Sequence, residues 1–267
     1  MMENYQDYLS VNKETWNKKV PVHAESDLYN LEAFKKGATS LMKYELDALP
    51  NVAGKSLLHL QCHFGQDTLS WNRLGAKCTG IDFSEKGIQL AKELNKELGL
   101  NTEFVCCNVY DVNKYISEKF DIVFTSYGTI GWLPDLQLWA KTIAARLKPG
   151  GTFFMAEFHP IVWMFDYQEK NASLRYKYNQ KEVIYEEYSG TYADTTNKMI
   201  TKEYGWNHGL GTVISALTSE GLNIEFLKEY DESPYNVLPN LVETTNGMFV
   251  TKDQLYPLIY TIKATKK

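Results

Sequence analysis

An alternation of short apolar runs with amphipathic stretches, between residues 55 and 158, constrains the fold more than any other feature of the sequence. The apolar runs have the length and composition of buried strands. They are residues 56–60, 77–81, 102–107, 120–126 and 152–158. Between them, apolar side chains repeat at helical spacing, as at Leu136, Trp139 and Ile143. Strands that are apolar along their whole length and alternate with helices predict a parallel sheet covered on both faces.

The same order of elements determines how the sheet is wound. Crossover connections are right-handed, so the sequence predicts a doubly wound, Rossmann-like α/β fold. Ser84 is expected to cap the helix after the second strand, and Gly99 to end it. Ligands of such sheets bind at the carboxyl ends of the strands, so we expect the site residues there.

The rest of the chain has a different pattern. Residues 1–50 look partly helical and are expected to form an N-terminal arm or lid. Residues 51–267 are predicted to form the main domain, with an inserted substrate-side segment at 159–206. That segment is rich in Tyr, Trp, Lys and Glu and is expected to form irregular or antiparallel strands. Further along we expect a helix over 210–217, strands over 222–227 and 258–264, and a loop over 231–254.

Composition restricts the class of function and the compartment. The 267 residues include 33 acidic and 28 basic side chains, a net charge of −5, which argues against nucleic-acid partners. No apolar run reaches the roughly 18 residues of a membrane span, and residues 1–10 do not resemble a signal peptide. The four cysteines lack zinc-ligand spacing and predict buried, reduced thiols and no metal site. We therefore expect a cytoplasmic protein with no membrane partner.

Two loops carry the first indication of a ligand. The loop after the first strand reads LQCHFGQD and has one glycine, Gly65, where a dinucleotide fingerprint has three, so NAD and FAD are disfavoured. The second strand ends at Asp82, whose carboxylate can accept hydrogen bonds from both hydroxyls of a ribose. A ligand that has a ribose but no phosphate needs this carboxylate and does not need all three glycines.

A family resemblance rests on three segments in order: LHLQCHFGQDTLSWNRLGAKCTGIDFS, FDIVFTSYGTIGWLPD and LKPGGTFFMAEFHP. Together they resemble the class I S-adenosylmethionine-dependent methyltransferases, in the branch of small-molecule methyltransferase domains. The resemblance covers residues 55–158 and extends more weakly through 204–230 and the last strand. It implies a seven-stranded, mostly parallel sheet with an antiparallel last strand and a small accessory layer. It also implies transfer of the methyl group of S-adenosylmethionine to a small-molecule acceptor by in-line displacement, with S-adenosylhomocysteine as product.

The resemblance assigns the first loop to the methionine part of the cofactor. Gly65 would admit a close approach of the backbone. The loop residues with this expected role are Gln61, Cys62, His63, Phe64 and Gly65. Two of them depart from the family pattern, because Gln61 replaces an acid and Cys62 replaces a glycine.

Ribose and adenine are assigned to the next two strand ends. Asp82 would hold the ribose hydroxyls and Phe83 would pack on the adenine. Asn108 stands where the family has an aspartate, and its amide oxygen can accept from the adenine amino group. The backbone of Val109 or Tyr110 would meet the ring edge. The alternatives are that Asp82 caps a helix, that Phe83 is a core residue and that Asn108 is a turn residue.

The acceptor is expected beside the fourth and fifth strands. Ser126 and Tyr127 would lie next to the methionine part and the methyl group. His159 and His208 are the candidates for a general base if the acceptor is an alcohol or a phenol, with His23 a weaker one. The structural alternative for His159 is a hydrogen bond to nearby backbone, and for His208 it is to cap or orient the helix that follows. The acceptor atom, O, N, S or C, cannot be read from the sequence.

Three other functions are alternatives to small-molecule methyl transfer. A nucleic-acid methyltransferase of this fold carries an (Asp/Asn)-Pro-Pro-aromatic run after the fourth strand, whereas residues 126–129 read SYGT. A nicotinamide-dependent oxidoreductase requires the glycines that the first loop lacks. A catalytically silent cofactor-binding or interaction module of the same fold stays open, as do a monomer and a homodimer.

Overall fold

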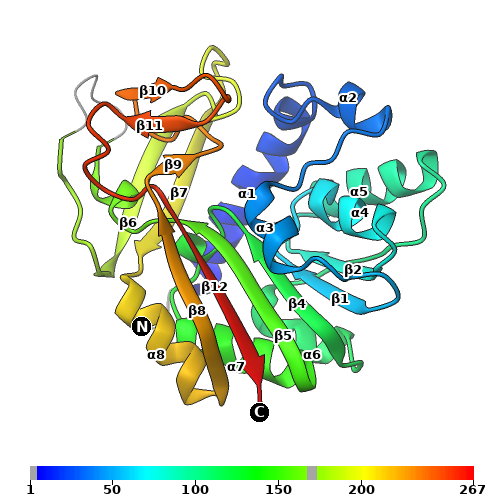
Figure 1. Ribbon diagram of the computed structural model, residues 1–267. Helices are drawn as coiled ribbons and strands as arrows, with labels where there is room; N and C mark the ends of the chain where they lie inside the picture. Colours follow the sequence, from blue (N-terminus) through cyan, green and yellow to red (C-terminus); the bar gives the residue numbers. More distant parts are fainter. Residues whose placement is uncertain (1–4, 167–172) are drawn as a thin grey trace.

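A computed structural model describes residues 5–166 and 173–267 of the chain and shows a seven-stranded sheet at its centre (Figure 1). The strand order is β3-β2-β1-β4-β5-β12-β8. The strands are β1 (Ser56–Leu60), β2 (Lys77–Asp82), β3 (Glu103–Cys106), β4 (Phe120–Ser126), β5 (Leu147–Phe158), β8 (Leu222–Tyr230) and β12 (Ile259–Lys266). β1 to β5 pair in parallel, and β12 is antiparallel to both β5 and β8. This arrangement confirms the predicted fold, including the antiparallel last strand.

Both faces of the sheet are covered, as the uniformly apolar strands predicted. Successive side chains of a strand point to opposite faces. Leu58 and Val123 pack in the core under α7 (Leu136–Arg146) and α8 (Leu210–Ser219), with the short α6 (Val112–Tyr115) beside them. Their neighbours Leu57 and Phe124 pack in a second core under α3 (Lys43–Ala48) and α4 (Gln66–Arg73). Burial on two faces therefore fixes the register of the central strands.

The expected cap and stop of the helix after β2 are both present. The Ser84 hydroxyl accepts a hydrogen bond from the Gly87 amide at 3.0 Å and caps α5 (Glu85–Glu97). Gly99 follows the helix with a φ of 62°, a left-handed conformation that favours glycine. These caps place the carboxyl end of β2 directly at the beginning of α5.

The N-terminal segment is helical, as expected, and crosses the carboxyl edge of the sheet (Figure 1). Its long helix, α1 (Tyr5–Ala24), packs against α5 and against β7. The short α2 (Leu31–Lys35) and α3 follow it towards β1. The N-terminal segment therefore lies next to the strand ends where the site was predicted.

Two further β-structures lie above the same edge. β6 (Gln180–Ser189) and β7 (Ile200–Asn207) form the antiparallel pair expected within 159–206, of which residues 167–172 lie outside the described part. The expectation of a loop over 231–254 was wrong. That segment contains β9 (Glu232–Ser233), β10 (Leu241–Glu243) and β11 (Phe249–Thr251), which pair with one another. Strands of two or three residues are too short to show a period-2 pattern.

Sequence reasoning also missed three short 3₁₀ helices that follow strands. They are η1 (Val109–Asp111), η2 (Ile130–Trp132) and η3 (Val162–Met164). Each comes shortly after the carboxyl end of β3, β4 or β5, so these turns shape the backbone at the site.

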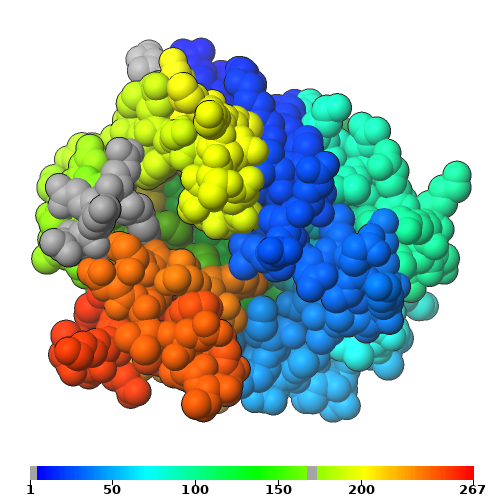
Figure 2. All heavy atoms as spheres, turned by 90° about the horizontal axis from the view of Figure 1, so that it is seen from above, coloured from blue at the N-terminus to red at the C-terminus, as the bar shows by residue number. Residues whose placement is uncertain are grey.

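Viewed onto this carboxyl edge, the molecule has a hollow at its centre (Figure 2). Three segments surround it, namely the N-terminal segment in blue, the β6–β7 region in yellow and the β9–β11 region in orange. The middle of the chain, in green, forms its floor. We call it the carboxyl-end hollow. Among the described helices, none is both long and apolar enough to cross a membrane.

Candidate functional site

The loop after β1 has an unusual backbone. Gln61 and His63 have φ angles of 55° and 52°, in the left-handed region that costs non-glycine residues about 1–2 kcal/mol each. The Gln61 amide donates to the Thr129 carbonyl at 2.8 Å, and the His63 backbone N–H donates to Asp82 at 2.9 Å. The loop is thus fastened to the ends of β4 and β2. Such strained residues cluster at functional sites, where surrounding contacts hold them in place.

The other three loop residues face the interior. Cys62 and Phe64 are buried in a core cluster with residues of α4 and α5. A Cβ on Gly65 would lie 2.7 Å from the Phe104 ring, and its φ is 80°. The glycine is therefore required by packing and by its left-handed backbone. Of the five predicted loop residues, only Gln61 and His63 therefore lie outside this core cluster.

Asp82 is the central acid of the site and is 7 % exposed. Its Oδ2 accepts from the His63 amide at 2.9 Å, and its Oδ1 accepts from the Ser84 amide at 2.8 Å. Burial raises its pKa to about 6, although these amides oppose the rise. The helix cap is Ser84, so Asp82 instead shapes the turn between β2 and α5. Each of its oxygens keeps a second lone pair for a ligand hydroxyl.

Asn108 and its neighbours follow β3. Asn108 Oδ1 accepts from the Tyr110 amide at 3.1 Å, the turn role that was its alternative, and its Nδ2 donates to the Tyr5 hydroxyl at 3.0 Å. The Val109 side chain is buried in the main core, which leaves only its backbone near the strand end. The Tyr110 hydroxyl donates to the Asp135 carbonyl at 2.9 Å. Phe83 directly follows β2 and is half-buried. Its carbonyl accepts a hydrogen bond from the thiol of Cys106, the last residue of β3.

Ser126 and Tyr127 end β4. The Ser126 hydroxyl donates to Asp67 Oδ2 at 3.0 Å. The Tyr127 ring contacts the rings of Phe158 and Tyr235, with centroids 5.8 and 5.2 Å apart. Asp67 belongs to the first turn of α4, and sequence reasoning gave it no role. Only the fold brings it to the end of β4.

Glu157 is a second residue that sequence reasoning missed. Its buried carboxylate accepts from the backbone amides of Gly128, Thr129, Ile130 and Phe158, the Thr129 bond being 2.7 Å long. Burial raises its pKa, and the same amides oppose the rise. Glu157 therefore fixes the turn after β4, whose Thr129 carbonyl in turn holds the first loop.

The two candidate bases are both engaged through hydrogen bonds. His159 Nδ1 accepts from the Ile161 amide at 3.2 Å, so its Nε2 carries the proton and donates to Glu229 at 2.9 Å. His208 Nε2 donates to the Leu133 carbonyl at 2.7 Å. Burial lowers the pKa of both. Both rings are thus anchored to neighbouring backbone or carboxylate.

Helix α1 contacts the predicted ligand-binding residues themselves. Its Tyr5 reaches Asn108, and its Asn17 Oδ1 accepts from the Ser84 hydroxyl at 2.7 Å. At the other end of α1, His23 Nδ1 lies 3.1 Å from His63 Nε2. Burial lowers the pKa of both histidines, to about 3 for His23. The helix therefore lies over the ends of β1, β2 and β3.

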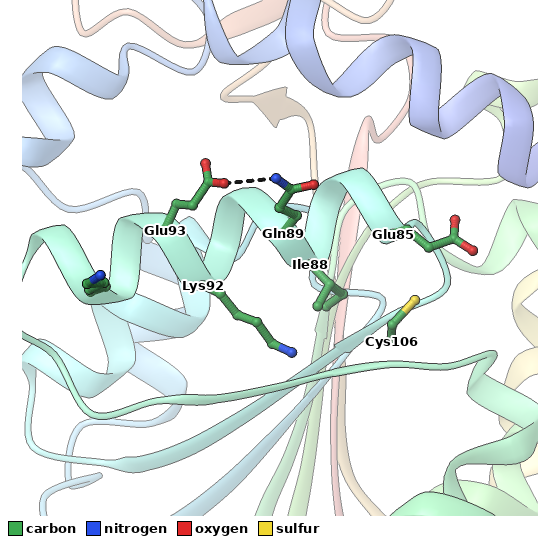
Figure 3. A pocket seen from close by; sticks show the side chains of 7 residues that line it. Glu85, Ile88, Gln89, Lys92, Glu93 and Cys106 are labelled. Carbon is green, nitrogen blue, oxygen red and sulfur yellow. Dashed lines mark hydrogen bonds between the residues drawn. The ribbon is translucent and has the colours of Figure 1, made fainter.

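A separate groove of about 440 Å³ runs along α5 beside the edge strand β3 (Figure 3). Most of its lining is one solvent-facing side of α5, where Gln89 donates to Glu93 at 3.0 Å. Only Glu85 and Cys106 come near the strand ends. Long charged side chains on an exposed helix face are typical of a solvated surface, and we assign no site there.

Comparison with known proteins identifies the central part of the fold. Residues 58–155, which run from β1 to β5, match the family model described as a methyltransferase domain. Over this part the chain is similar to methyltransferase domains, as the sequence resemblance implied. Solved structures that share the fold include proteins described as S-adenosylmethionine-dependent methyltransferases.

Curated relatives and solved structures agree with this result. A ubiquinone biosynthesis O-methyltransferase of Nitrobacter winogradskyi is 29 % identical over 147 residues, 54 % of this chain and 55 % of that protein. One of Coxiella burnetii is 33 % identical over 103 residues, 39 % and 43 % respectively. The chain thus matches about half the length of these relatives. An S-adenosylmethionine-dependent methyltransferase structure from Clostridium acetobutylicum aligns over 96 % of this chain and 98 % of its own, with a TM-score of 0.57 and 16 % identity, which shows a shared fold.

Proposed function

We propose that the chain transfers the methyl group of S-adenosylmethionine to a small-molecule acceptor at the carboxyl ends of β1, β2 and β4. The observation that carries the proposal is the Asp82 carboxylate, which joins the end of β2 to the loop after β1 through His63. In a methyltransferase domain this arrangement suits a ribose between the two strand ends. The relatives named as O-methyltransferases support a small-molecule acceptor.

The residues present fit such a ligand. His23 Nε2, Gln61 Oε1 and His63 Nδ1 are buried and have no hydrogen-bond partner among the described residues. Buried polar atoms are normally paired, so these three suit a ligand that offers both donors and acceptors. S-adenosylmethionine has an ammonium, a carboxylate and ribose hydroxyls, and its sulfonium supplies an electrophilic methyl group.

The predicted residues that follow β1, β2 and β3 and face the site then have proposed tasks. Gln61 and His63 contact the methionine part, while Asp82 accepts from the ribose hydroxyls. Phe83 and Asn108 flank the adenine, with the backbone after Asn108 at the ring edge. The N-terminal segment, residues 1–50, acts as a lid, because α1 already contacts Asn108 and His63.

The acceptor side follows from the same geometry. His159 and His208 then act as positioning residues, because each donates a ring N–H to a neighbouring acceptor. The acceptor is Glu229 for His159 and the Leu133 carbonyl for His208. The methyl group of a sulfonium is already a strong electrophile. Alignment of the acceptor nucleophile, the methyl carbon and the sulfur therefore provides most of the rate enhancement. The free thiols of all four cysteines support a cytoplasmic location.

Calorimetric titration tests the proposal. We expect the protein to bind S-adenosylmethionine and S-adenosylhomocysteine but not NAD. Asp82→Ala should weaken both sulfur ligands at least 10-fold, and Asp27→Ala, at an exposed turn position, should have no effect. A folded wild-type protein that binds neither ligand would refute the proposal. Binding without turnover of any acceptor would favour a catalytically silent module.

A further inference from the structure

Glu45 is a buried carboxyl group next to Tyr127, the residue that follows β4. The residue lies in α3 and is 1 % exposed. Its Oε2 accepts from the Met42 amide at 3.0 Å. Its Oε1 is buried and has no hydrogen bond of normal geometry, although the Tyr127 hydroxyl is close enough to affect its pKa. A buried acceptor left unpaired costs about 1–3 kcal/mol, which a ligand with a donor would recover.

A second carboxyl group lies close to the first. Asp67 accepts from the Ser126 hydroxyl at the end of β4, where the methyl group is expected. Burial, followed by the charge of Asp67, raises the pKa of Glu45 to about 8. Burial also raises the pKa of Asp67. When two carboxyl groups are buried close together, it is unfavourable for both to be ionised unless a positive charge lies beside them.

The described part of the chain supplies no such charge. Its ion pairs include neither Glu45 nor Asp67. Lys19, the buried ammonium of α1, pairs with Glu203 on β7. Lys43, beside Glu45 in sequence, pairs with Glu232 at 2.6 Å. The two carboxyl groups are therefore complementary to a cation from outside the chain.

Tyrosine rings from the surrounding segments complete the site. Tyr127, which directly follows β4, contacts Tyr235 of the β9–β11 region at 5.2 Å between centroids. The hydroxyls of Tyr29 and Tyr192, from the N-terminal segment and the β6–β7 region, lie 2.5 Å apart. These are the three segments that surround the hollow in Figure 2. Aromatic faces favour cations by about 0.5–2 kcal/mol each.

We propose that Glu45 and Asp67, beside the rings of Tyr127 and Tyr235, bind the amino group of a small amine, which is the methyl acceptor. This inference rests on the proposed function and narrows its substrate class. An amine satisfies Glu45 Oε1 with an N–H donor and brings the missing positive charge.

The same residues prepare the amine for reaction. The ammonium gives one proton to Glu45, which becomes a carboxylic acid, and the nitrogen is left with a lone pair. That pair forms the bond to the methyl carbon while the carbon–sulfur bond breaks, its electrons remaining on sulfur. The positive charge of the sulfonium thus moves to the methylated nitrogen, beside Asp67. A carboxyl group whose pKa lies near working pH is suited to this proton transfer.

Matched probes test the proposal on the full chain saturated with S-adenosylhomocysteine. Binding is measured by calorimetry for ethylamine and benzylamine, for ethanol and benzyl alcohol, and for acetate and benzoate. We expect an amine to bind at least 10-fold more tightly than its matched alcohol and acid. Glu45→Gln should remove that preference and leave the affinity for S-adenosylhomocysteine unchanged. Glu32→Gln, at an exposed position of α2, is the control.

Tyr235→Phe provides a second variant that keeps the ring, and we expect it to retain the preference for amines. Release of S-adenosylhomocysteine from S-adenosylmethionine in the presence of the bound amine then measures turnover. Failure of S-adenosylhomocysteine to bind overturns the proposed function and this inference together. Normal S-adenosylhomocysteine binding with no preference for amines, or with a preference that survives Glu45→Gln, overturns this inference alone.

Discussion

His23 Nδ1 in α1 and His63 Nε2 in the loop after β1 face each other at 3.1 Å, and these residues are 40 positions apart in the chain. Trp16 of the same helix packs against the His63 ring, with centroids 5.1 Å apart. Both imidazoles are buried and their pKa values are lowered, so they meet as neutral rings at neutral pH. This contact fastens α1, which we propose as part of a lid, to the loop that we assign to the methionine part of the ligand.

Replacing His23 should loosen the lid. In His23→Ala we expect the association and dissociation rate constants of S-adenosylhomocysteine both to rise, about 10-fold for dissociation, because closure of α1 loses a buried contact. Stopped-flow tryptophan fluorescence measures both rates, with Trp16 as an internal reporter. Lys18→Ala, on the exposed side of α1, should leave them unchanged. Unchanged rates in His23→Ala would show that α1 does not close over the ligand.

Glu157 should be a major determinant of stability. Glu157→Gln places an amide N–H₂ where an oxygen accepts from backbone amides, and so leaves buried donors such as the Thr129 N–H unpaired. We expect a loss of about 2–4 kcal/mol in the free energy of unfolding. Urea denaturation followed by circular dichroism measures it. Glu97→Gln, which removes one end of a surface ion pair with Lys35, should change stability by less than about 1 kcal/mol. Equal effects of the two variants would contradict the geometry of Glu157.

Glu45 should make the stability of the protein depend on pH. Its pKa is about 8 in the folded chain against 4.5 when unfolded, so the folded state binds the extra proton between these values. The free energy of unfolding contributed by Glu45 therefore falls as pH rises from 4.5 to 8, by about 1.4 kcal/mol per unit of pKa difference, and is constant above.

Comparison with Glu45→Gln isolates this effect, because other buried acids, such as Asp67 and Asp82, are common to both chains. The variant should gain stability relative to wild type as pH rises from 5 to 8. Urea denaturation at pH 5, 6.5, 8 and 9 measures the difference. A difference that is constant over this range would mean that Glu45 ionises normally in the folded state.

The sequence predicted the central fold because its signals are local. Uniformly apolar strands, the Ser84 cap and the position of Gly99 are each readable within a few residues, and each was confirmed. The segment 231–254 was misjudged because β9, β10 and β11 are held by pairing with one another, and strands of two or three residues leave no pattern.

The residues of the candidate site also differ in whether local sequence could place them. Asp82 and the first loop follow strands directly, so the fold class was enough to place them at one edge. Glu45 comes from a helix outside the recognisable motifs, whereas Asp67 lies within the first motif at a position to which the resemblance assigns no role. Only tertiary packing brings the two side chains together near the end of β4. Contacts between residues tens of positions apart have no local signature in a single sequence.

Substitution of Gly65 tests why this position requires a glycine. The sequence resemblance implies that Gly65 admits the cofactor, whereas the structure places Phe104 at 2.7 Å from the position of a Cβ. Gly99 is the matched control, since its φ is also positive, 62°, but a Cβ there has nothing within 4 Å. Both Gly→Ala variants should lose about 1–2 kcal/mol from the left-handed backbone. Gly65→Ala should lose a further 1–3 kcal/mol, about the cost of overpacking a core.

Urea denaturation and titration with S-adenosylhomocysteine together separate the two roles. If packing against Phe104 sets the requirement, the double change Gly65→Ala with Phe104→Leu should recover part of the lost stability, since a shorter side chain makes room for the methyl group. If the glycine instead faces the ligand, Gly65→Ala should weaken S-adenosylhomocysteine binding while its stability stays close to that of Gly99→Ala. The first outcome would mean that this loop meets its ligand through Gln61 and His63, and that the glycine serves to hold their strained backbone against the core.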